Sequence, residues 1–282
     1  MNFFTQVAIP RGSFELKPCQ PMLFVGSCFA DEMGRRFTDN LFRTLVNPFG
    51  VMYNPASILH TVSRLSEDHQ LPFTTSQPAC AVITLGTNHV YIEKSTGEIV
   101  DNCQKRPQKL FHEEQLSVDE CYGFLSQTVG LLMEAAPQVQ IVVTVSPIRY
   151  RKYGYHGSRL SKATLLLAAD RLTQVYPSQV SYFPAYEIMN DELRDYRFYR
   201  PDMLHPTEQA VDYIYSAFAS AYFGEAAVRF IERWHPVREA LMHRPLHPES
   251  DEYQSFIKAT QQKLLQLRKD YPMMPELPFN KE

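Results

Sequence analysis

The sequence predicts an α/β fold built on a mostly parallel sheet, because short apolar runs alternate along the chain with segments of helical periodicity. The runs at 22–25, 81–85, 141–145 and 180–183 are rich in β-branched and other apolar residues, as expected of buried strands. Strands separated by helices need crossover connections, which favour a parallel arrangement. In such sheets ligands bind at the carboxyl ends of the strands, so residues that follow a predicted strand are candidates for a functional site.

The first predicted strand leads into a helix through a short turn. The apolar run 22–25 ends at Gly26, and apolar residues then recur at every fourth position from Phe29 to Leu41. This spacing is typical of an amphipathic helix. The chain is therefore expected to follow a strand–turn–helix path with Gly26-Ser27-Cys28 at the turn.

Later helices are predicted from their start and stop signals. Ser117 and Glu120 form a capping box at the start of one helix, which Pro137 ends. Further helices are predicted from about Ser161 and over 206–223. These helices separate the later apolar runs, which completes the alternating pattern.

Two parts of the chain are expected to differ in organisation. Residues 1–232 are predicted to form the α/β domain, and residues 233–282 a helical appendage packed on it. Within the first part, residues 43–78 contain several prolines and little clean periodicity. This segment is predicted to be partly irregular and to form a wall of the cleft above the sheet.

The composition is that of an ordinary globular protein and excludes some partners. A net charge of −3 over 282 residues gives no general attraction to nucleic acid or to anionic membranes. No apolar stretch reaches the length of a membrane helix, and the first residues lack the pattern of a signal peptide. Five cysteines without a Cys-x-x-Cys pair argue against a disulfide framework or structural zinc. A reducing compartment, the cytoplasm, is therefore expected.

The turn after the first strand carries the candidate nucleophiles. Free backbone N–H groups and the macrodipole at a helix N-terminus favour negative charge. A thiol placed there is expected to have a lowered pKa, whereas a hydroxyl needs a neighbouring base. Ser27 and Cys28 offer one of each. Both remain candidates, and Cys28 is favoured.

A candidate base lies near the other end of the α/β part. Asp202 and His205 are three residues apart, directly before Pro206. A carboxylate at this spacing can accept from the ring N–H and leave the other ring nitrogen free as a base. Pro206 suits the first position of a helix, which would put His205 at the cap and leaves a purely structural capping role open. His156 is a weaker candidate base, because no carboxylate stands beside it in the sequence.

Candidate oxyanion donors and substrate-binding residues are expected at the same edge of the sheet, where the strands end. The backbone N–H groups of Cys28 and Gly50 and the side-chain amide of Asn88 are the predicted oxyanion donors. His89 and Arg149 are candidate substrate-binding residues. The basic and aromatic segment that Arg149 begins could be a nucleic-acid patch, but a loop that binds an anionic substrate over the site is favoured.

Several motifs together resemble those of the GSCFA-domain family over about residues 20–225. They are Phe24-Val25-Gly26-Ser27-Cys28-Phe29-Ala30, Asn47-Pro48-Phe49-Gly50-Val51-Met52-Tyr53-Asn54-Pro55, Val145-Ser146-Pro147, Tyr186-Glu187-Ile188-Met189, Asp191-Glu192-Leu193-Arg194-Asp195-Tyr196-Arg197-Phe198-Tyr199 and Asp202-Met203-x-His205-Pro206. That family is grouped by resemblance with SGNH hydrolases. The resemblance implies a three-layer α/β/α sandwich with a flavodoxin-like sheet, and says little about the substrate.

The sequence departs from the SGNH pattern in two places. The SGNH nucleophile block reads Gly-Asp-Ser, and an ungapped match puts Cys28 at the nucleophile, whereas a shift of one residue would put Ser27 there. The Gly-x-Asn-Asp block becomes a sequence that keeps Asn88 and has His89 in place of the Asp.

The resulting hypothesis is an acyl-ester hydrolase or acyltransferase that works through a covalent acyl-enzyme on Cys28 or Ser27. Its expected partner is an acylated carbohydrate or another hydroxyl-bearing small molecule, and the chemistry needs no metal and no cofactor. Nucleic acid and membrane are not expected as partners, and the sequence does not determine the oligomeric state. The alternative is a catalytically silent binding module that keeps the same cleft.

Overall fold

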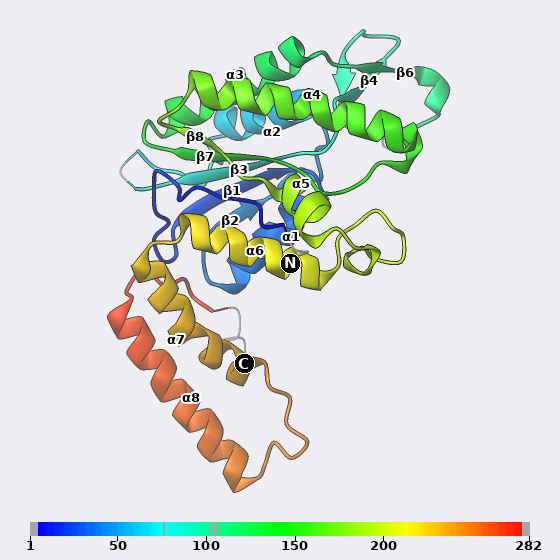
Figure 1. Ribbon diagram of the computed structural model, residues 1–282. Helices are drawn as coiled ribbons and strands as arrows, with labels where there is room; N and C mark the ends of the chain where they lie inside the picture. The colour runs from blue at the N-terminus through cyan, green and yellow to red at the C-terminus, as the bar shows by residue number, and fades with distance from the viewer. Residues whose placement is uncertain (1–4, 76, 102, 104–105, 278–282) are drawn as a thin grey trace.

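The computed structural model describes residues 5–75, 77–101, 103 and 106–277, and a five-stranded sheet forms its centre (Figure 1). All neighbouring strands in this sheet pair in parallel. The strands, in their order across the sheet, are β2 (Arg43–Val46), β1 (Pro21–Gly26), β3 (Cys80–Leu85), β7 (Gln140–Val145) and β8 (Val180–Tyr182).

This order defines where a ligand site can form. From β1 the chain crosses to β2 on one side, and the next strand of the sheet, β3, lies on the other side of β1. The flavodoxin-like order therefore reverses between β1 and β3, and the carboxyl ends of these two strands flank the switch point. The turn that carries Ser27 and Cys28 follows β1 at this point.

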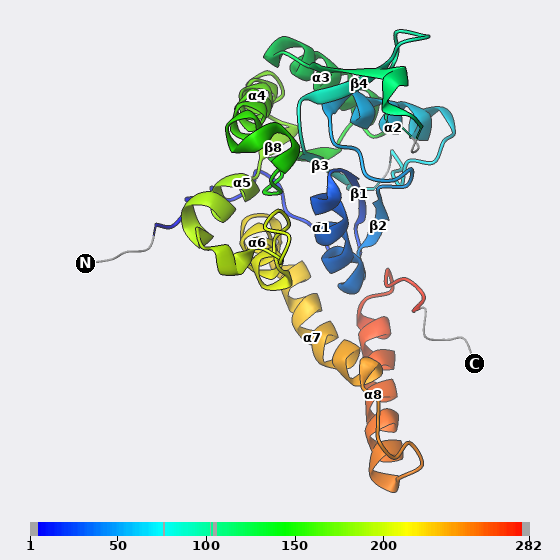
Figure 2. The same ribbon diagram turned by 90° about the vertical axis from the view of Figure 1, so that its right-hand side faces the viewer.

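Helices cover both faces of the sheet, which gives three layers (Figures 1 and 2). One face packs against α2 (Pro55–Glu67), α3 (Val118–Ala135) and α4 (Gly154–Val175). The other packs against α1 (Cys28–Asp39) and α6 (Glu208–Tyr222). The predicted fold class is confirmed, and so is the capping box that starts α3.

The strands bury side chains on both faces, which explains their continuous apolar runs. In β1, Leu23 and Val25 point into the core formed with α2, α3 and α4, whereas Met22 and Phe24 point into the core formed with α1 and α6. All four side chains are fully buried. A strand with two buried faces cannot alternate apolar with polar residues, so the run alone predicts its position inside the sheet.

Residues 43–78 are more regular than the sequence analysis predicted. They contain β2 and the 13-residue helix α2, which begins after the N-cap Asn54 with Pro55 in its first turn. Ile58, Val62 and Leu65 form its buried stripe at helical spacing. Pro55 marks the start of this helix.

A second, antiparallel sheet was not predicted from the sequence. It lies at one end of the molecule and consists of β5 (Ile99–Val100), β4 (His89–Glu93) and β6 (Phe111–Gln115) in that order (Figure 1). Its strands are short and partly exposed, so their apolar periodicity is weak.

The remaining short elements are η1 (Gln108–Leu110), η2 (Arg151–Tyr153), α5 (Ala185–Glu187), the π-helical η3 (Ile188–Leu193) and η4 (Tyr196–Phe198).

Two C-terminal helices, α7 (Glu225–Met242) and α8 (Asp251–Asp270), form a hairpin that extends from the α/β layers (Figures 1 and 2). Trp234 anchors the hairpin, because its side chain is buried and its Nε1–H donates to the carbonyl oxygen of Asp39 at 2.8 Å. The boundary expected between residues 232 and 233 falls inside α7. Among the described residues, no helix combines the length and the apolar character needed to cross a membrane.

Candidate active site

The turn between β1 and α1 is held in a geometry that requires glycine. Gly26 has a φ of +132°, and a Cβ at this position would lie 2.1 Å from the carbonyl oxygen of Thr84 on the neighbouring strand. The next residue, Ser27, donates its backbone N–H to the same oxygen at 3.0 Å. The turn is therefore fixed against the end of β3, and the first residues of α1 are fixed with it.

The structure separates the two candidate nucleophiles. Ser27 is fully buried as the N-cap of α1, where its Oγ accepts from the Phe29 N–H at 3.3 Å and lies 3.0 Å from Thr84 Oγ1. Cys28 is half-buried, and its Sγ lies 3.7 Å from Nε2 of His205. The Ser27 hydroxyl thus stabilises the turn, and the Cys28 thiol is the group that faces a base.

Asp202 holds the imidazole of His205 in place. Its Oδ2 lies 2.6 Å from Nδ1 of His205, while Oδ1 accepts the backbone N–H groups of Leu204 at 2.8 Å and His205 at 3.0 Å. The backbone N–H groups of His205 and Leu204, and then the His205 ring, hold the pKa of the Asp202 carboxyl well below its usual range. An ionised Asp202 accepts from Nδ1–H and so leaves Nε2 unprotonated toward the thiol.

The position of His205 differs from the expected one. Helix α6 begins at Glu208, and its N-cap is Thr207, whose Oγ1 accepts from the Ala210 N–H at 3.3 Å. His205 lies before the helix in a loop, where its carbonyl accepts from the Arg200 N–H at 2.7 Å. The prediction that His205 caps this helix is wrong, because the Thr207 hydroxyl takes that role.

The prediction of a lowered thiol pKa is also wrong. Burial raises the pKa of Cys28 and outweighs the lowering contributions of its own backbone N–H and of the Tyr53 hydroxyl. Asp31 and Glu32 in the first turn of α1 add to the raising effect. Cys28 is therefore a thiol at neutral pH and needs a base before it can attack.

Tyr53 is a site residue that the sequence analysis did not single out. Its hydroxyl lies close to the Cys28 thiol, and each group shifts the pKa of the other. Its own backbone carbonyl accepts from the N–H groups of Gly86 at 2.9 Å and Thr87 at 2.8 Å, directly after β3. Tyr53 also precedes Asn54, the N-cap of α2, so two structural elements position its backbone.

Two of the predicted oxyanion donors are already engaged. The Gly50 N–H donates to the Asn47 carbonyl at 2.8 Å within a turn. Asn88 is buried, and its Nδ2 donates to the Leu116 carbonyl at 2.7 Å. The assignment of the Gly50 N–H is therefore wrong, whereas the Asn88 amide has a second N–H and its assignment stays a prediction. The backbone N–H of Cys28 lies beside its own thiol.

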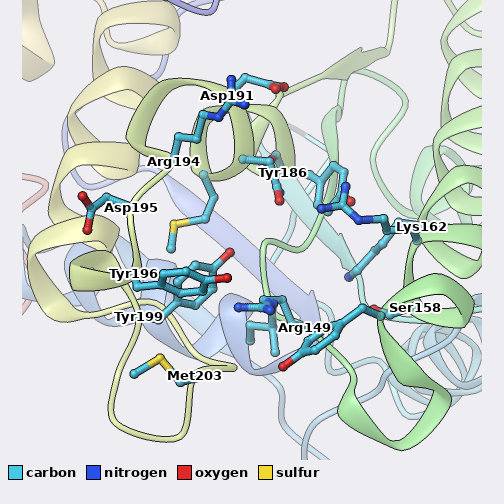
Figure 3. A pocket seen from close by; sticks show the side chains of 15 residues that line it. Arg149, Ser158, Lys162, Tyr186, Asp191, Arg194, Asp195, Tyr196, Tyr199 and Met203 are labelled. Atoms are coloured by element: carbon cyan, nitrogen blue, oxygen red, sulfur yellow. The ribbon is translucent and has the colours of Figure 1, made fainter. Parts of the chain in front are cut away.

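His89 lies in a cavity of about 810 Å³ that Tyr53 also lines. Its ring stacks on Tyr153 with centroids 3.6 Å apart, and Nδ1 lies 3.5 Å from Glu113 Oε1. Burial lowers the pKa of His89 more than the Glu113 carboxylate raises it. His89 is thus a wall residue of this cavity with a lowered pKa, while Arg149 lines a different cavity, shown in Figure 3.

A buried lysine side chain bonds the residues that follow two central strands. Lys162 of α4 is almost fully buried, and its Nζ donates to the carbonyls of Gly86 at 2.7 Å and Ser146 at 2.8 Å. These residues directly follow β3 and β7, so one amine links the carboxyl ends of two central strands. Burial lowers the pKa of Lys162 to about 7. Within the described part of the chain, no group of three or more His, Cys, Asp or Glu could hold a metal ion.

Both unforeseen residues left a signal in the sequence. Asn54 and Pro55 are an N-cap and first-turn pair, which places Tyr53 directly before a helix at the sheet rim. Lys162 falls in the buried stripe of α4 that includes Leu165 and Ala169. A lysine on a buried stripe is unusual enough to indicate a specific role.

The chain is similar to solved structures of several esterases and lipases, at low sequence identity. A GDSL-like lipase from Bacteroides thetaiotaomicron is 16% identical, with 72% of this chain and 87% of that chain covered and a TM-score of 0.45. A carbohydrate esterase of family 3 from Talaromyces cellulolyticus is 11% identical, with coverages of 76% and 98% and a TM-score of 0.43. A member of the lipolytic G-D-S-L family from Veillonella parvula is 11% identical, with coverages of 71% and 96% and a TM-score of 0.44. No curated protein matches the chain.

Family models match most of the sequence. The GSCFA family model matches residues 21–77 and 70–218, which include the β1–α1 turn, Tyr53 and the loop that carries Asp202 and His205. A second model, the C-terminal domain of GSCFA domain proteins, matches residues 234–282. Because the first model alone covers more than half of the chain, the protein belongs to the GSCFA family.

Proposed function

We propose that this protein is a cysteine-dependent acyl-ester hydrolase or acyltransferase. The observation that carries the proposal is the relay from Cys28 Sγ to His205 Nε2 at 3.7 Å and from His205 Nδ1 to Asp202 Oδ2 at 2.6 Å. A nucleophile, a base and a carboxylate that orients the base are the three parts that covalent acyl transfer requires. The substrate is an acylated carbohydrate or another hydroxyl-bearing small molecule.

The first half of the reaction forms a thioester. Nε2 of His205 takes the thiol proton while Sγ of Cys28 attacks the ester carbonyl, and Asp202 stabilises the imidazolium that results. The tetrahedral intermediate collapses as its C–O bond breaks, and the imidazolium returns the proton to the leaving alcohol oxygen. Because burial keeps Cys28 protonated, the base acts during the attack and not before it.

The second half releases the acyl group. A water molecule, or the hydroxyl of an acceptor, gives its proton to Nε2 and attacks the thioester carbonyl. The C–S bond breaks, the thiolate takes the proton back from the imidazolium, and an acid or a new ester leaves. Water as the second nucleophile makes the protein a hydrolase, and an acceptor hydroxyl makes it a transferase.

Two donors support the stabilisation of an oxyanion in this reaction. The backbone N–H of Cys28 is at the helix N-terminus, and the Tyr53 hydroxyl lies close to the thiol in the resting site. As Sγ becomes bonded to carbon, that hydroxyl donates to the adjacent oxyanion. Tyr53 takes the donor role that the sequence analysis gave to Gly50.

Replacing Tyr53 with phenylalanine is expected to lower kcat for a short-chain acyl ester by about a hundredfold, the typical cost of one oxyanion donor. KM should change little, because the hydroxyl bonds the oxyanion and not the ground-state ester. Steady-state kinetics on a panel of acetyl and butyryl esters, with purified wild type and variant, gives both constants.

Tyr91→Phe is the matched control, since Tyr91 lines the same cavity as Tyr53 and its hydroxyl accepts from Lys152. Equal losses of kcat in Tyr53→Phe and Tyr91→Phe would show that the Tyr53 hydroxyl has no specific role in stabilising the oxyanion. Turnover of no ester by the wild type, combined with retained ligand binding, would favour a binding module.

A further inference from the structure

A separate cavity of about 650 Å³ lies beside the loop that carries Asp202 and His205 (Figure 3). Met203, between Asp202 and Leu204, forms part of its wall. The loop after β7 forms another part through Arg149, whose backbone N–H donates to the Leu204 carbonyl at 3.2 Å. The cavity therefore adjoins the loop residues next to His205.

Aromatic rings hold the Arg149 side chain in this cavity. Its guanidinium carbon lies 4.6 Å from the ring centroid of Tyr155, 4.9 Å from that of Tyr199 and 6.0 Å from that of Tyr196. Figure 3 shows the guanidinium next to the rings of Tyr196 and Tyr199. Ring faces orient a guanidinium without neutralising it, and its N–H groups stay free to donate.

No carboxylate compensates this charge. Among the residues that the structure describes, Arg149 forms no side-chain hydrogen bond and no ion pair, and the same holds for Arg159, which lines the same cavity. Two acids also line it, but Asp195 bonds the Arg197 N–H at 2.9 Å. In Figure 3 the carboxylates of Asp191 and Asp195 point away from Arg149.

We infer that this cavity binds an anionic group, a carboxylate or a phosphate, on the alcohol part of the ester, and that Arg149 is its principal contact. A guanidinium donates two parallel hydrogen bonds to either anion. The alcohol leaves on the His205 side, because Nε2 returns its proton to the alcohol oxygen. Testing this inference by enzyme activity rests on the proposed function, because the protein must cleave esters for the effect to be measured.

Matched acetate esters test the inference with the full chain. The probes are 4-acetoxybenzoate, which has a carboxylate on the leaving phenol, 4-acetoxyphenyl phosphate, and the methyl ester of the first as the neutral reference. Each variant is compared with the wild type on each ester, so differences in leaving-group reactivity cancel. The two anionic probes distinguish a carboxylate ligand from a phosphate ligand.

Arg149→Gln is expected to lower kcat/KM about 10- to 100-fold for at least one anionic ester, the effect of losing a charge-assisted hydrogen bond, with less than about threefold change for the neutral ester. Arg149→Lys should recover only part of the loss, since an ammonium lacks the planar pair of donors. Arg197→Gln removes the same charge from a neighbouring exposed turn and should change neither class of ester. Equal losses on anionic and neutral esters in Arg149→Gln would overturn the inference.

Binding separates this inference from the proposed function. If the wild type hydrolyses none of the three esters, the proposed function fails, and benzoate and phenyl phosphate are titrated into Cys28→Ala by calorimetry. Saturable binding that Arg149→Gln weakens at least about tenfold supports the anion site. Absence of binding, or binding that Arg149→Gln leaves unchanged, contradicts it.

Discussion

Cys28→Ala is expected to lower kcat/KM for an acyl ester by at least about a thousandfold, because it removes the nucleophile and leaves only the oxyanion donors and substrate binding. Ser27→Ala should keep most of the turnover. Its hydroxyl is buried at the N-cap of α1 and bonds Thr84 and the Phe29 N–H, so its loss costs about 1 kcal/mol of stability and not the reaction. Ester kinetics and urea denaturation of both variants measure the two effects.

Cys103→Ala is the control for this pair, since Cys103 is the other half-buried free thiol among the described residues. It should retain full activity. An active Cys28→Ala together with an inactive but folded Ser27→Ala would assign the reaction to the serine. Activity that survives both changes would exclude covalent catalysis at this turn.

His205→Ala is expected to lower kcat by about 10⁴-fold, the scale of loss when the base of a triad is removed or misoriented. Asp202→Asn should cost less, because the carboxylate is partly exposed, but it still removes control of the imidazole tautomer. His156→Ala is the control histidine variant, since His156 lies exposed at the start of α4. Loss of activity in His156→Ala with retention in His205→Ala would contradict the assignment of the base.

The pH dependence of His205→Ala follows from the thiol pKa. Without a base, only the thiolate form of Cys28 attacks, and burial raises the pKa of that thiol. The thiolate fraction grows as pH rises toward this pKa, so the residual rate should increase about tenfold for each pH unit from about pH 7 to about pH 9. A residual rate that is flat over this range would mean that the thiolate is not the attacking species.

The sequence predicted the central layers well, because the strands that matter most are buried on both faces. β1 appears in the sequence as an apolar run and β7 as a run rich in β-branched residues, and the capping box of α3 satisfies its own backbone groups locally. The small sheet that contains β4 escaped prediction because its strands depend on pairing with one another, and pairing across distant segments leaves little local periodicity.

The candidate site was predictable where the chemistry is local. The spacing of Asp202 and His205 and the turn at Cys28 are short motifs, and the structure brings Cys28 and His205 together across a sequence separation of 177. Tyr53 was not predictable in the same way, because its role depends on how the segment before α2 crosses the end of β3. The thiol pKa likewise depends on burial by the whole fold, which outweighs the helix N-terminus that the sequence indicates.

The most direct test of the central claim is the detection of an acyl-enzyme on Cys28. Wild type is quenched with acid during turnover of an activated ester, digested, and analysed by mass spectrometry with fragmentation and with neutral hydroxylamine, which cleaves thioesters and spares oxygen esters. The account predicts one hydroxylamine-labile acyl group on Cys28 that is missing in Cys28→Ala. An acyl group on Ser27 that resists hydroxylamine, or turnover without any adduct on either residue, would contradict it.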